Sequence, residues 1–300
     1  MVQDSLIVSV ASTQFSRYAA AELRLSPQTI AKYRDRIRQV IAAVDDLPVE
    51  SITRDHILQI KARAFARGNG VSRVNTLMFA LRRLLVYCRE VYQIPVLDPG
   101  LIRPNRIPKR ELAFLSPEEV ERFVASIRVS CVDGADHKNG LRFRALVEVL
   151  LGSAMRIGEV LSLKRRDIDF VRREAPVIGK GNKQRAVFFT NRALLWLSRY
   201  LSSRTDEHPA LFVTQEADAA LSRTDIWRPF ARYRLLSGIS KPVTPHLLRH
   251  TAATQLLFNG CQVGHIKEIL GHERLETTCR YYLGLDRRAA KAAHGQFLVY

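Results

Sequence analysis

A short stretch that is rich in proline and in basic residues divides the chain. Residues 104–110 read Pro-Asn-Arg-Ile-Pro-Lys-Arg, whereas the segments on both sides show helix-like apolar spacing. This stretch is therefore expected to be an exposed linker. Three hundred residues also exceed what a single hydrophobic core usually holds. The sequence predicts two domains, 1–103 and 115–300, joined by a linker at 104–114.

The part before the linker has apolar residues at helical spacing. Ser26 can cap a helix that has Pro27 at its first position, and the run from Gly68 to Gly70 separates two helical segments. We therefore expect the first domain to be a small all-helical bundle. Its expected helices span residues 12–23, 27–44, 53–67 and 71–92.

The second domain is expected to begin with a capped helix. Ser116 is followed by Pro117 and, three residues on, by Glu119, which together make a capping box. A further apolar helix at 143–151 leads through a chain break to Arg156, after which a new helix begins. Arg156 is thus expected where a break meets a helix start, with its guanidinium able to point into a cleft.

Residues 168–190 change character. Short β-favouring runs flank the segment Gly-Lys-Gly-Asn-Lys at 179–183, which predicts a hairpin. Lys180 in that turn can reach into a groove, although most lysines beside such turns are merely solvated. The expected fold class is mainly α, with a small β-sheet or hairpin in the C-terminal domain.

The charge balance indicates a polyanionic partner. Lys and Arg number 47 against 29 Asp and Glu, a formal net charge of +18. In the first domain Arg34, Arg36 and Arg38 alternate with other residues, and Arg82 and Arg83 sit on an otherwise apolar helix. Each alone fits a solvated helix face, but the domain-wide excess favours a surface that faces DNA.

A membrane partner is not expected, because the sequence has no apolar run of about 18 residues, no signal-like segment and no lipidation motif. The expected location is the cytoplasm, in association with the nucleoid. The four cysteines are scattered without a CxxC pair, so they are expected to be reduced thiols, with no structural metal.

A helix that begins after Thr244-Pro245 carries His246 and Arg249, three residues apart and hence on one face. Such a pair at a helix N-terminus favours an anion site over a buried structural histidine. His250 follows on the same helix, but no HExxH pattern indicates zinc. Gly260 is expected to end this helix.

A short helix is expected next, ending at Gly271 directly before His272. Tyr281 lies nine residues after His272, so the two side chains converge only if the chain bends. Thr277 and Thr278 can cap a new short helix that delivers Tyr281.

These residue types together suit the chemistry of phosphodiester cleavage by a phenol. Preorganised Arg and His donors offset the charge on the non-bridging oxygens as it grows in the transition state. A phenol with a pKa of about 10 needs a base or cationic neighbours to attack at neutral pH. The departing sugar oxygen needs a proton, which a Lys can donate. No metal or other cofactor is required. In order, the candidate residues are Arg156, Lys180, His246, Arg249, His272 and Tyr281.

Four segments that carry these residues resemble the successive signatures of the tyrosine recombinase, or phage integrase, family, in content, order and spacing. They are GSAMRIGEVL at 152–161, VIGKGNKQR at 177–185, HLLRHT at 246–251 and LGHERLETTCRY at 270–281. The helical first domain is similar to the family's core-binding domain. Ala154-Met155 departs from the Gly-Leu that the family commonly has before the arginine, a change expected to be tolerated.

The resemblance implies a role for each position. Arg156 and Arg249 would bind the scissile phosphate, with His246 and His272 completing the pocket. Lys180 would be the general acid for the leaving 5′-hydroxyl, and Tyr281 the nucleophile that forms a 3′-phosphotyrosyl link. Glu159 would support the active site without reacting. Tyr282 is a weaker candidate than Tyr281 for the nucleophile, and Lys183 is a weaker candidate than Lys180 for the general acid.

The resemblance also implies an assembly. The two domains would form a clamp on double-stranded DNA with an inverted-repeat core site. Strand exchange would proceed through a Holliday junction in a homo-tetramer, with or without a second recombinase. The tail at 286–300 would dock on a neighbouring protomer. The two-domain layout, without a further arm-binding domain, favours an Xer-like or transposon-encoded enzyme.

Three other interpretations stay open at this point. A type IB topoisomerase uses similar chemistry but relaxes supercoils as a monomer, against which the compact first domain and short tail argue. A DNA-binding regulator of this fold without activity is opposed by the complete set of six candidate residues. A nucleic-acid-binding bundle with an unrelated second domain is the third.

Overall fold

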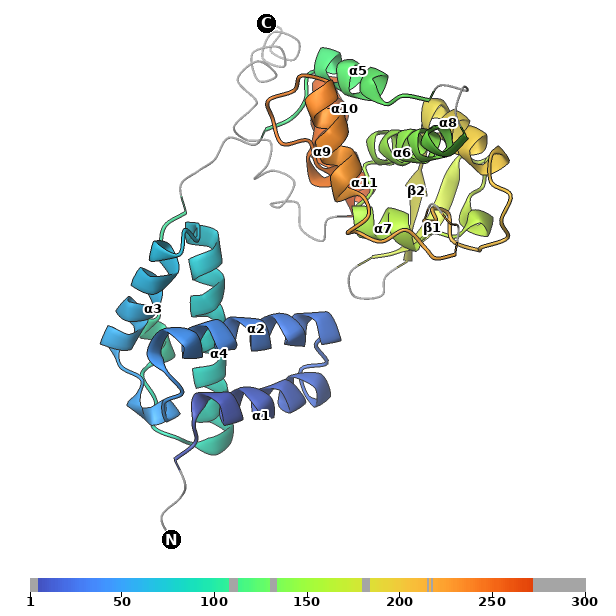
Figure 1. The fold of residues 1–300 in the computed structure, drawn as a ribbon. Helices are drawn as coiled ribbons and strands as arrows, with labels where there is room; N and C mark the ends of the chain where they lie inside the picture. Colours follow the sequence, from blue (N-terminus) through green and yellow to red (C-terminus); the bar gives the residue numbers. More distant parts are fainter. Residues whose placement is uncertain are drawn as a thin grey trace, which may run out of the picture. The chain divides into compact units, whose positions relative to one another are not determined.

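The chain falls into two compact units, Met1–Arg110 and Glu111–Tyr300, in the computed structural model (Figure 1). The structure describes residues 5–107, 113–129, 134–179, 184–214, 216 and 218–271. Each unit has its own buried apolar cluster. Among the described residues the fold is mainly helical with one small two-stranded sheet, which confirms the expected fold class.

The first unit is a four-helix bundle with two single 3₁₀ turns, Val49–Ser51 and Pro99–Leu101. Helix α4 packs against the other three helices, and buried Phe15, Ile37, Leu81 and Leu84 fill the space between them. The helices are α1 (Val8–Ala21), α2 (Pro27–Val44), α3 (Arg54–Ala66) and α4 (Val71–Tyr92).

The starts of α1 and α2 depend on different signals. Ser26 caps α2 as expected, since its hydroxyl accepts a hydrogen bond from the Thr29 N–H at 3.3 Å. The prediction that the first helix begins at residue 12 is wrong, because α1 begins at Val8. The Val8 N–H donates to the Leu47 carbonyl at 2.9 Å, a contact from a distant part of the sequence. Spacing within the helix cannot reveal such a partner.

The second unit is built around helix α6, which packs against α8 and α10 (Figure 1). Helix α6 begins at Gly134, earlier than the predicted residue 143. The prediction missed its first residues because they are polar or small and carry no apolar period. The helices are α5 (Pro117–Ser126), α6 (Gly134–Ser153), α7 (Ile157–Ser162), α8 (Asn191–Ser202), α9 (Trp227–Leu236), α10 (Pro245–Phe258) and α11 (Val263–Leu270), with a 3₁₀ turn at Arg165–Asp167.

The expected hairpin is present as strands β1 (Glu174–Ile178) and β2 (Gln184–Phe188). They pair antiparallel, with Glu174 opposite Phe188 and Ile178 opposite Gln184. Ala175, Val177 and Val187 alternate with exposed neighbours and point into the core, as the period of two requires. The hairpin therefore holds its outer end, next to residues 180–183, at a fixed place on the unit.

Both expected caps of the second unit form. The Ser116 hydroxyl accepts from the Glu119 N–H at 3.2 Å, and the Glu119 carboxylate accepts from the Ser116 N–H at 2.8 Å. The Thr244 hydroxyl accepts from the Leu247 N–H at 3.1 Å, which fixes the start of α10. The first turn of α10 holds His246, so this cap sets where that side chain begins.

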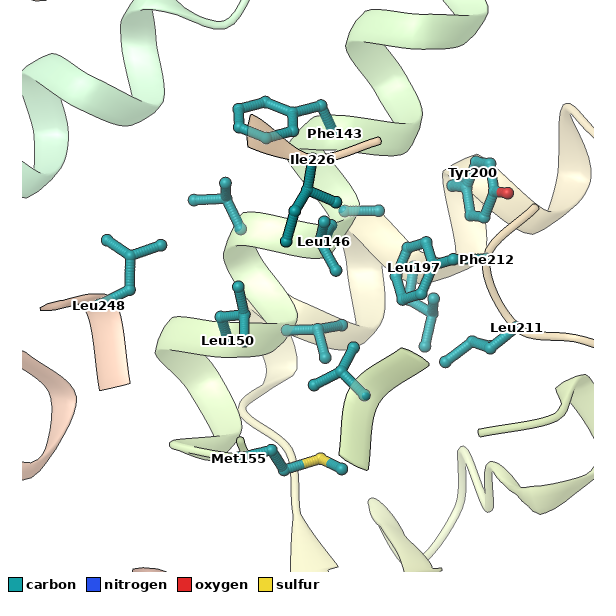
Figure 2. Packing of buried hydrophobic residues seen from close by; sticks show 14 of the residues in the cluster. Phe143, Leu146, Leu150, Met155, Leu197, Tyr200, Leu211, Phe212, Ile226 and Leu248 are labelled. Carbon is teal, nitrogen blue, oxygen red and sulfur yellow. The ribbon is translucent and has the colours of Figure 1, made fainter. Parts of the chain in front are cut away.

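The core of the second unit lies between α6, α8 and the segments that follow α8 (Figure 2). Leu146 and Leu150 of α6 and Leu197 of α8 belong to this cluster, and Met155, which directly precedes Arg156, lies at one end of it. Leu146, Leu150, Leu197 and Met155 are all fully buried. Dense packing of this kind leaves the chain at 154–156 little room to shift.

One carboxylate within this unit is buried between two arginines. Glu148 is 3% exposed, and its Oε1 lies 2.9 Å from Nε of both Arg144 and Arg192. A buried charge persists only when it is paired in this way. The ion pair with Arg192 ties α6 to α8. No helix among the described residues is long and apolar enough to cross a membrane.

Candidate active site

Arg156 occupies the N-cap position of α7, at the chain break that the sequence predicts. Its backbone is extended, and its N–H donates to Glu159 Oε2 at 2.9 Å. Its Nη1 donates to the other oxygen of the same carboxylate, also at 2.9 Å. The side chain is 44% exposed. Glu159 thus fixes both the backbone and the guanidinium of Arg156 while leaving that guanidinium accessible.

The turn before Arg156 has an unusual backbone. Ala154 has φ +53°, in the left-handed region that costs a non-glycine residue roughly 1–2 kcal/mol. Its N–H donates to the Leu150 carbonyl at 3.1 Å, and its own carbonyl accepts from Arg249 Nη1 at 2.7 Å. These bonds hold Ala154 in a conformation that glycine would adopt more easily, so the departure Ala154-Met155 is accommodated.

Arg249 is buried, with 6% exposure, on α10. Besides the Ala154 carbonyl, it reaches the Leu270 carbonyl at the end of α11, which accepts from Nη2 at 2.6 Å. A planar guanidinium that holds two carbonyls in this way has a fixed orientation. Arg249 therefore joins the turn before Arg156 to the end of α11.

The C-terminal end of α11 is held by three arginines, each from a different element. The carbonyls of three successive residues accept one hydrogen bond each: Ile269 from Arg185 at 3.1 Å, Leu270 from Arg249 at 2.6 Å and Gly271 from Arg156 at 3.2 Å. Helix C-terminal carbonyls lack partners within the helix and carry partial negative charge, so cations are favoured there. The chain leaves this point directly into His272.

Glu159 is the carboxylate of this cluster. It is 8% exposed and lies 2.9 Å from Nη2 of Arg185 as well as from Arg156. Burial acts to raise the pKa of Glu159, but the hydrogen bonds from Arg156 and the charge of Arg185 outweigh it, so that pKa lies below its usual range. Glu159 is therefore ionised, and with Arg156, Arg185 and Arg249 it leaves an excess of positive charge.

The two histidines of α10 differ in their surroundings. His246 is exposed in the first turn, whereas Arg249 and His250 are buried. Spacing alone predicts a shared face for His246 and Arg249, but it does not predict this difference in burial. Burial and the nearby His246 lower the pKa of His250, which keeps its ring neutral.

Three of the six candidate residues, Arg156, His246 and Arg249, lie within the described residues. Lys180, His272 and Tyr281 lie outside them, as do their rivals Lys183 and Tyr282. The prediction that a helix ends at Gly271, directly before His272, is confirmed, because Gly271 caps α11 with φ +60°. Among the described residues, no group of three or more His, Cys, Asp or Glu side chains could hold a metal ion.

Arg185 is a residue of the site for which sequence reasoning assigned no role. It lies on β2, is 18% exposed at its side chain, and joins Glu159 to the Ile269 carbonyl. It lies opposite Val177 in the hairpin, and the strand period does not predict its long-range partners. Its only signal in the sequence is its place at the end of the segment 177–185.

The five arginines that the sequence singles out in the first unit differ in exposure. Arg34, Arg38 and Arg82 are exposed, whereas Arg36 and Arg83 are half-buried, and Arg36 makes an ion pair with Asp35 at 2.5 Å. Tyr33 belongs to the edge of the core, since its ring packs against Phe15 with centroids 5.5 Å apart. The exposed arginines thus remain the candidates for phosphate contacts.

Residues 113–288 match the model of the phage integrase family. The chain is 32% identical over 234 residues to the tyrosine recombinase XerC of Chlamydia trachomatis, covering 76% of this chain and 72% of that protein. It is 29% identical over 290 residues to the XerC of Proteus mirabilis, covering 93% and 90%. The Tn1549 transposon integrase, solved in complex with transposon right end DNA, has a similar fold, with a TM-score of 0.79 at 18% identity over 98% of this chain and 100% of that one.

The arginine-rich site and the match over more than half of the chain place the protein in the phage integrase family of tyrosine recombinases. It is an enzyme of the Xer type that carries out site-specific DNA recombination.

Proposed function

We propose that the six candidate residues form one catalytic site with the roles that the family resemblance implies. Arg156 and Arg249 bind the non-bridging oxygens of the scissile phosphate, and His246 and His272 complete the pocket. Tyr281 is the nucleophile and Lys180 is the general acid. Glu159 orients Arg156 and takes no part in the bond changes.

The proposed cleavage step exchanges one phosphodiester for another. The Tyr281 phenolic oxygen forms a bond to phosphorus as the bond from phosphorus to the 5′-oxygen breaks. The phenol proton passes to a neighbouring base, and the 5′-oxygen receives a proton from Lys180. The 5′-hydroxyl of a second strand then attacks the phosphotyrosyl link and releases Tyr281. Bond energy is conserved in the link, so no ATP is consumed.

The observation that carries this proposal is the meeting of three sequence motifs at the end of α11. Arg249 contacts the turn of the GSAMR segment and the Leu270 carbonyl, and Arg156 contacts the Gly271 carbonyl. A cluster of guanidiniums with one carboxylate has the charge that an oxyanion in the transition state requires. His272 follows this point directly in the sequence, which supports its assignment to the same pocket.

The role of Lys180 can be tested with a modified leaving group. Lys180→Ala is expected to slow single-turnover cleavage of a nicked duplex about a hundred-fold, because the 5′-oxygen then leaves without a proton. A substrate whose 5′-bridging oxygen is replaced by sulfur needs no such proton, so the variant should cleave it at nearly the wild-type rate.

The matched control for Lys180 is Lys183→Ala, which removes the same charge from the same loop. It should cleave both substrates like wild type. If the sulfur substrate restored the cleavage rate of Lys183→Ala and not that of Lys180→Ala, Lys183 would be the general acid. If both variants cleaved the ordinary substrate at the wild-type rate, neither lysine would be the general acid.

The proposed substrate is double-stranded DNA with an inverted-repeat core site, bound by both units as a clamp. The proposed assembly is a homo-tetramer that passes through a Holliday junction, with or without a second recombinase. The exposed arginines of the first unit support a role in phosphate contacts. The proposed location is the cytoplasm, in association with the nucleoid, and the proposed DNA target belongs to a chromosome or a mobile element.

The tail at 286–300 is proposed to dock on a neighbouring protomer. Its deletion is expected to leave binding to a single half-site duplex unchanged while it abolishes higher complexes on a full site, because only the latter need contacts between protomers. Native gels with half-site and full-site duplexes separate the two effects. Equal losses on both duplexes would contradict the proposal.

A further inference from the structure

Arg185 links three parts of the second unit. It is carried by β2, it donates through Nη2 to Glu159 Oε2 at 2.9 Å, and it donates through Nη1 to the Ile269 carbonyl at 3.1 Å. With 18% exposure it is largely buried. A buried arginine with two partners on different elements fixes the distance between those elements.

Glu159 connects Arg185 to Arg156. Its Oε1 accepts from Arg156 Nη1, while its Oε2 accepts from both the Arg156 N–H and Arg185 Nη2. Without Arg185, Glu159 loses one of its two guanidinium partners and can turn toward Arg156 alone. The direction of the Arg156 guanidinium depends on this carboxylate, so it depends on Arg185 as well.

The side chain of Arg185 also lies against Gly271. A Cβ built on Gly271 would overlap Nε of Arg185, and Gly271 has φ +60°. Glycine is therefore required there for two reasons, the backbone conformation and the close approach of the guanidinium. Together with the bond to the Ile269 carbonyl, this contact sets where the chain leaves α11 toward His272.

We propose that Arg185 is a positioning residue of the recombination site. It aims Arg156 through Glu159 and fixes the exit of α11 through Ile269 and Gly271. Because Arg185 lies on β2, it also ties the start of this strand to the end of α11. The inference rests on the proposed function for the roles of Arg156, Lys180 and His272. The contacts of Arg185 that support it are all made by described residues.

Hydrogen exchange tests the positioning directly and needs no activity. In the full-length Arg185→Ala protein, the amides of 263–271 are expected to exchange at least about five-fold faster than in wild type, with α6 unchanged. The matched control is Arg172→Ala, which removes an exposed arginine, 77% accessible, from the chain just before the same hairpin. Equal exchange of 263–271 in wild type and Arg185→Ala would overturn the proposal.

Single-turnover cleavage of a nicked duplex tests the consequence for chemistry. At saturating protein, Arg185→Ala is expected to cleave about ten- to a hundred-fold more slowly than wild type, because a catalytic group misplaced by about 1 Å lowers the rate by this order. The Kd for a half-site should stay within about three-fold, because Arg185 acts through other residues and not on DNA. A raised Kd with an unchanged rate at saturation would make Arg185 a DNA contact and overturn the proposal.

Arg185→Lys keeps the charge, and it provides a second test of the proposal if Arg185→Ala does not fold. A lysine cannot bridge Glu159 and the Ile269 carbonyl at once, so this variant should cleave at least about five-fold more slowly than wild type. Wild-type activity in Arg185→Lys would contradict the bridging role. The double variant Arg185→Ala/Glu159→Gln should lose less cleavage rate than the product of the two single-variant losses, since both residues belong to one hydrogen-bond network.

The exchange and cleavage experiments together distinguish a failure of the positioning role from a failure of the proposed function. If wild type forms no covalent adduct on any duplex, the catalytic roles fail, and hydrogen exchange at 263–271 still decides whether Arg185 holds the end of α11. If wild type cleaves but Arg185→Ala matches Arg172→Ala in both exchange and rate, the proposed function stands and the positioning role is wrong.

Discussion

Replacing Arg249 by alanine is expected to slow cleavage of a nicked duplex on the order of a thousand-fold. The proposed phosphate contact is lost, and so are the bonds to the Ala154 and Leu270 carbonyls at 2.7 and 2.6 Å. Those bonds hold the turn before Arg156 and the end of α11. Arg249→Lys should recover little activity, because an ammonium cannot reproduce the planar fork that holds both carbonyls.

The measurement is the single-turnover rate of covalent adduct formation at saturating protein, together with the Kd for the same duplex. Arg228→Ala is the matched control, since it removes an exposed arginine from α9, the helix that precedes α10 in the sequence. It is expected to cleave like wild type. A folded Arg249→Ala protein that cleaves within about ten-fold of wild type would contradict the role given to Arg249.

Leu146→Ala is expected to lower the free energy of unfolding of the second unit by about 2–5 kcal/mol. Leu146 is fully buried on α6, in the cluster that also contains Leu150 and Leu197 (Figure 2). The loss combines the missing transfer free energy of the side chain with the cavity that a dense core cannot close.

Urea unfolding followed by circular dichroism checks this value. Leu195→Ala on α8 is the matched control: the same side chain is 51% exposed there, so its loss should change the stability by no more than about 0.5 kcal/mol. If the two variants unfolded at the same urea concentration, the core assigned to α6 and α8 would be wrong.

The sequence predicts elements best where a local signal marks their ends. Ser26, Ser116 and Thr244 each act as the expected cap, and Gly271 ends α11 as expected. The pairing of β1 with β2 is also predicted, because short β-favouring runs flank the segment at 179–183.

The features that the sequence does not predict depend on contacts between distant residues. The start of α1 depends on the Leu47 carbonyl, and Arg185 finds its partners on α7 and α11. The three arginines at the end of α11 come from three elements, so no local period or motif reveals that they meet. The roles of the six candidate residues came from their order along the chain and from the family resemblance.

Tyr281 is proposed to attack DNA and form a covalent link with it. Wild type, Tyr281→Phe and Tyr282→Phe are each incubated with nicked duplexes from the neighbourhood of the gene, denatured and separated by gel electrophoresis. We expect a DNA-linked species with wild type and Tyr282→Phe and none with Tyr281→Phe, which lacks the nucleophilic oxygen. An adduct that persists in Tyr281→Phe and disappears in Tyr282→Phe would contradict the claim.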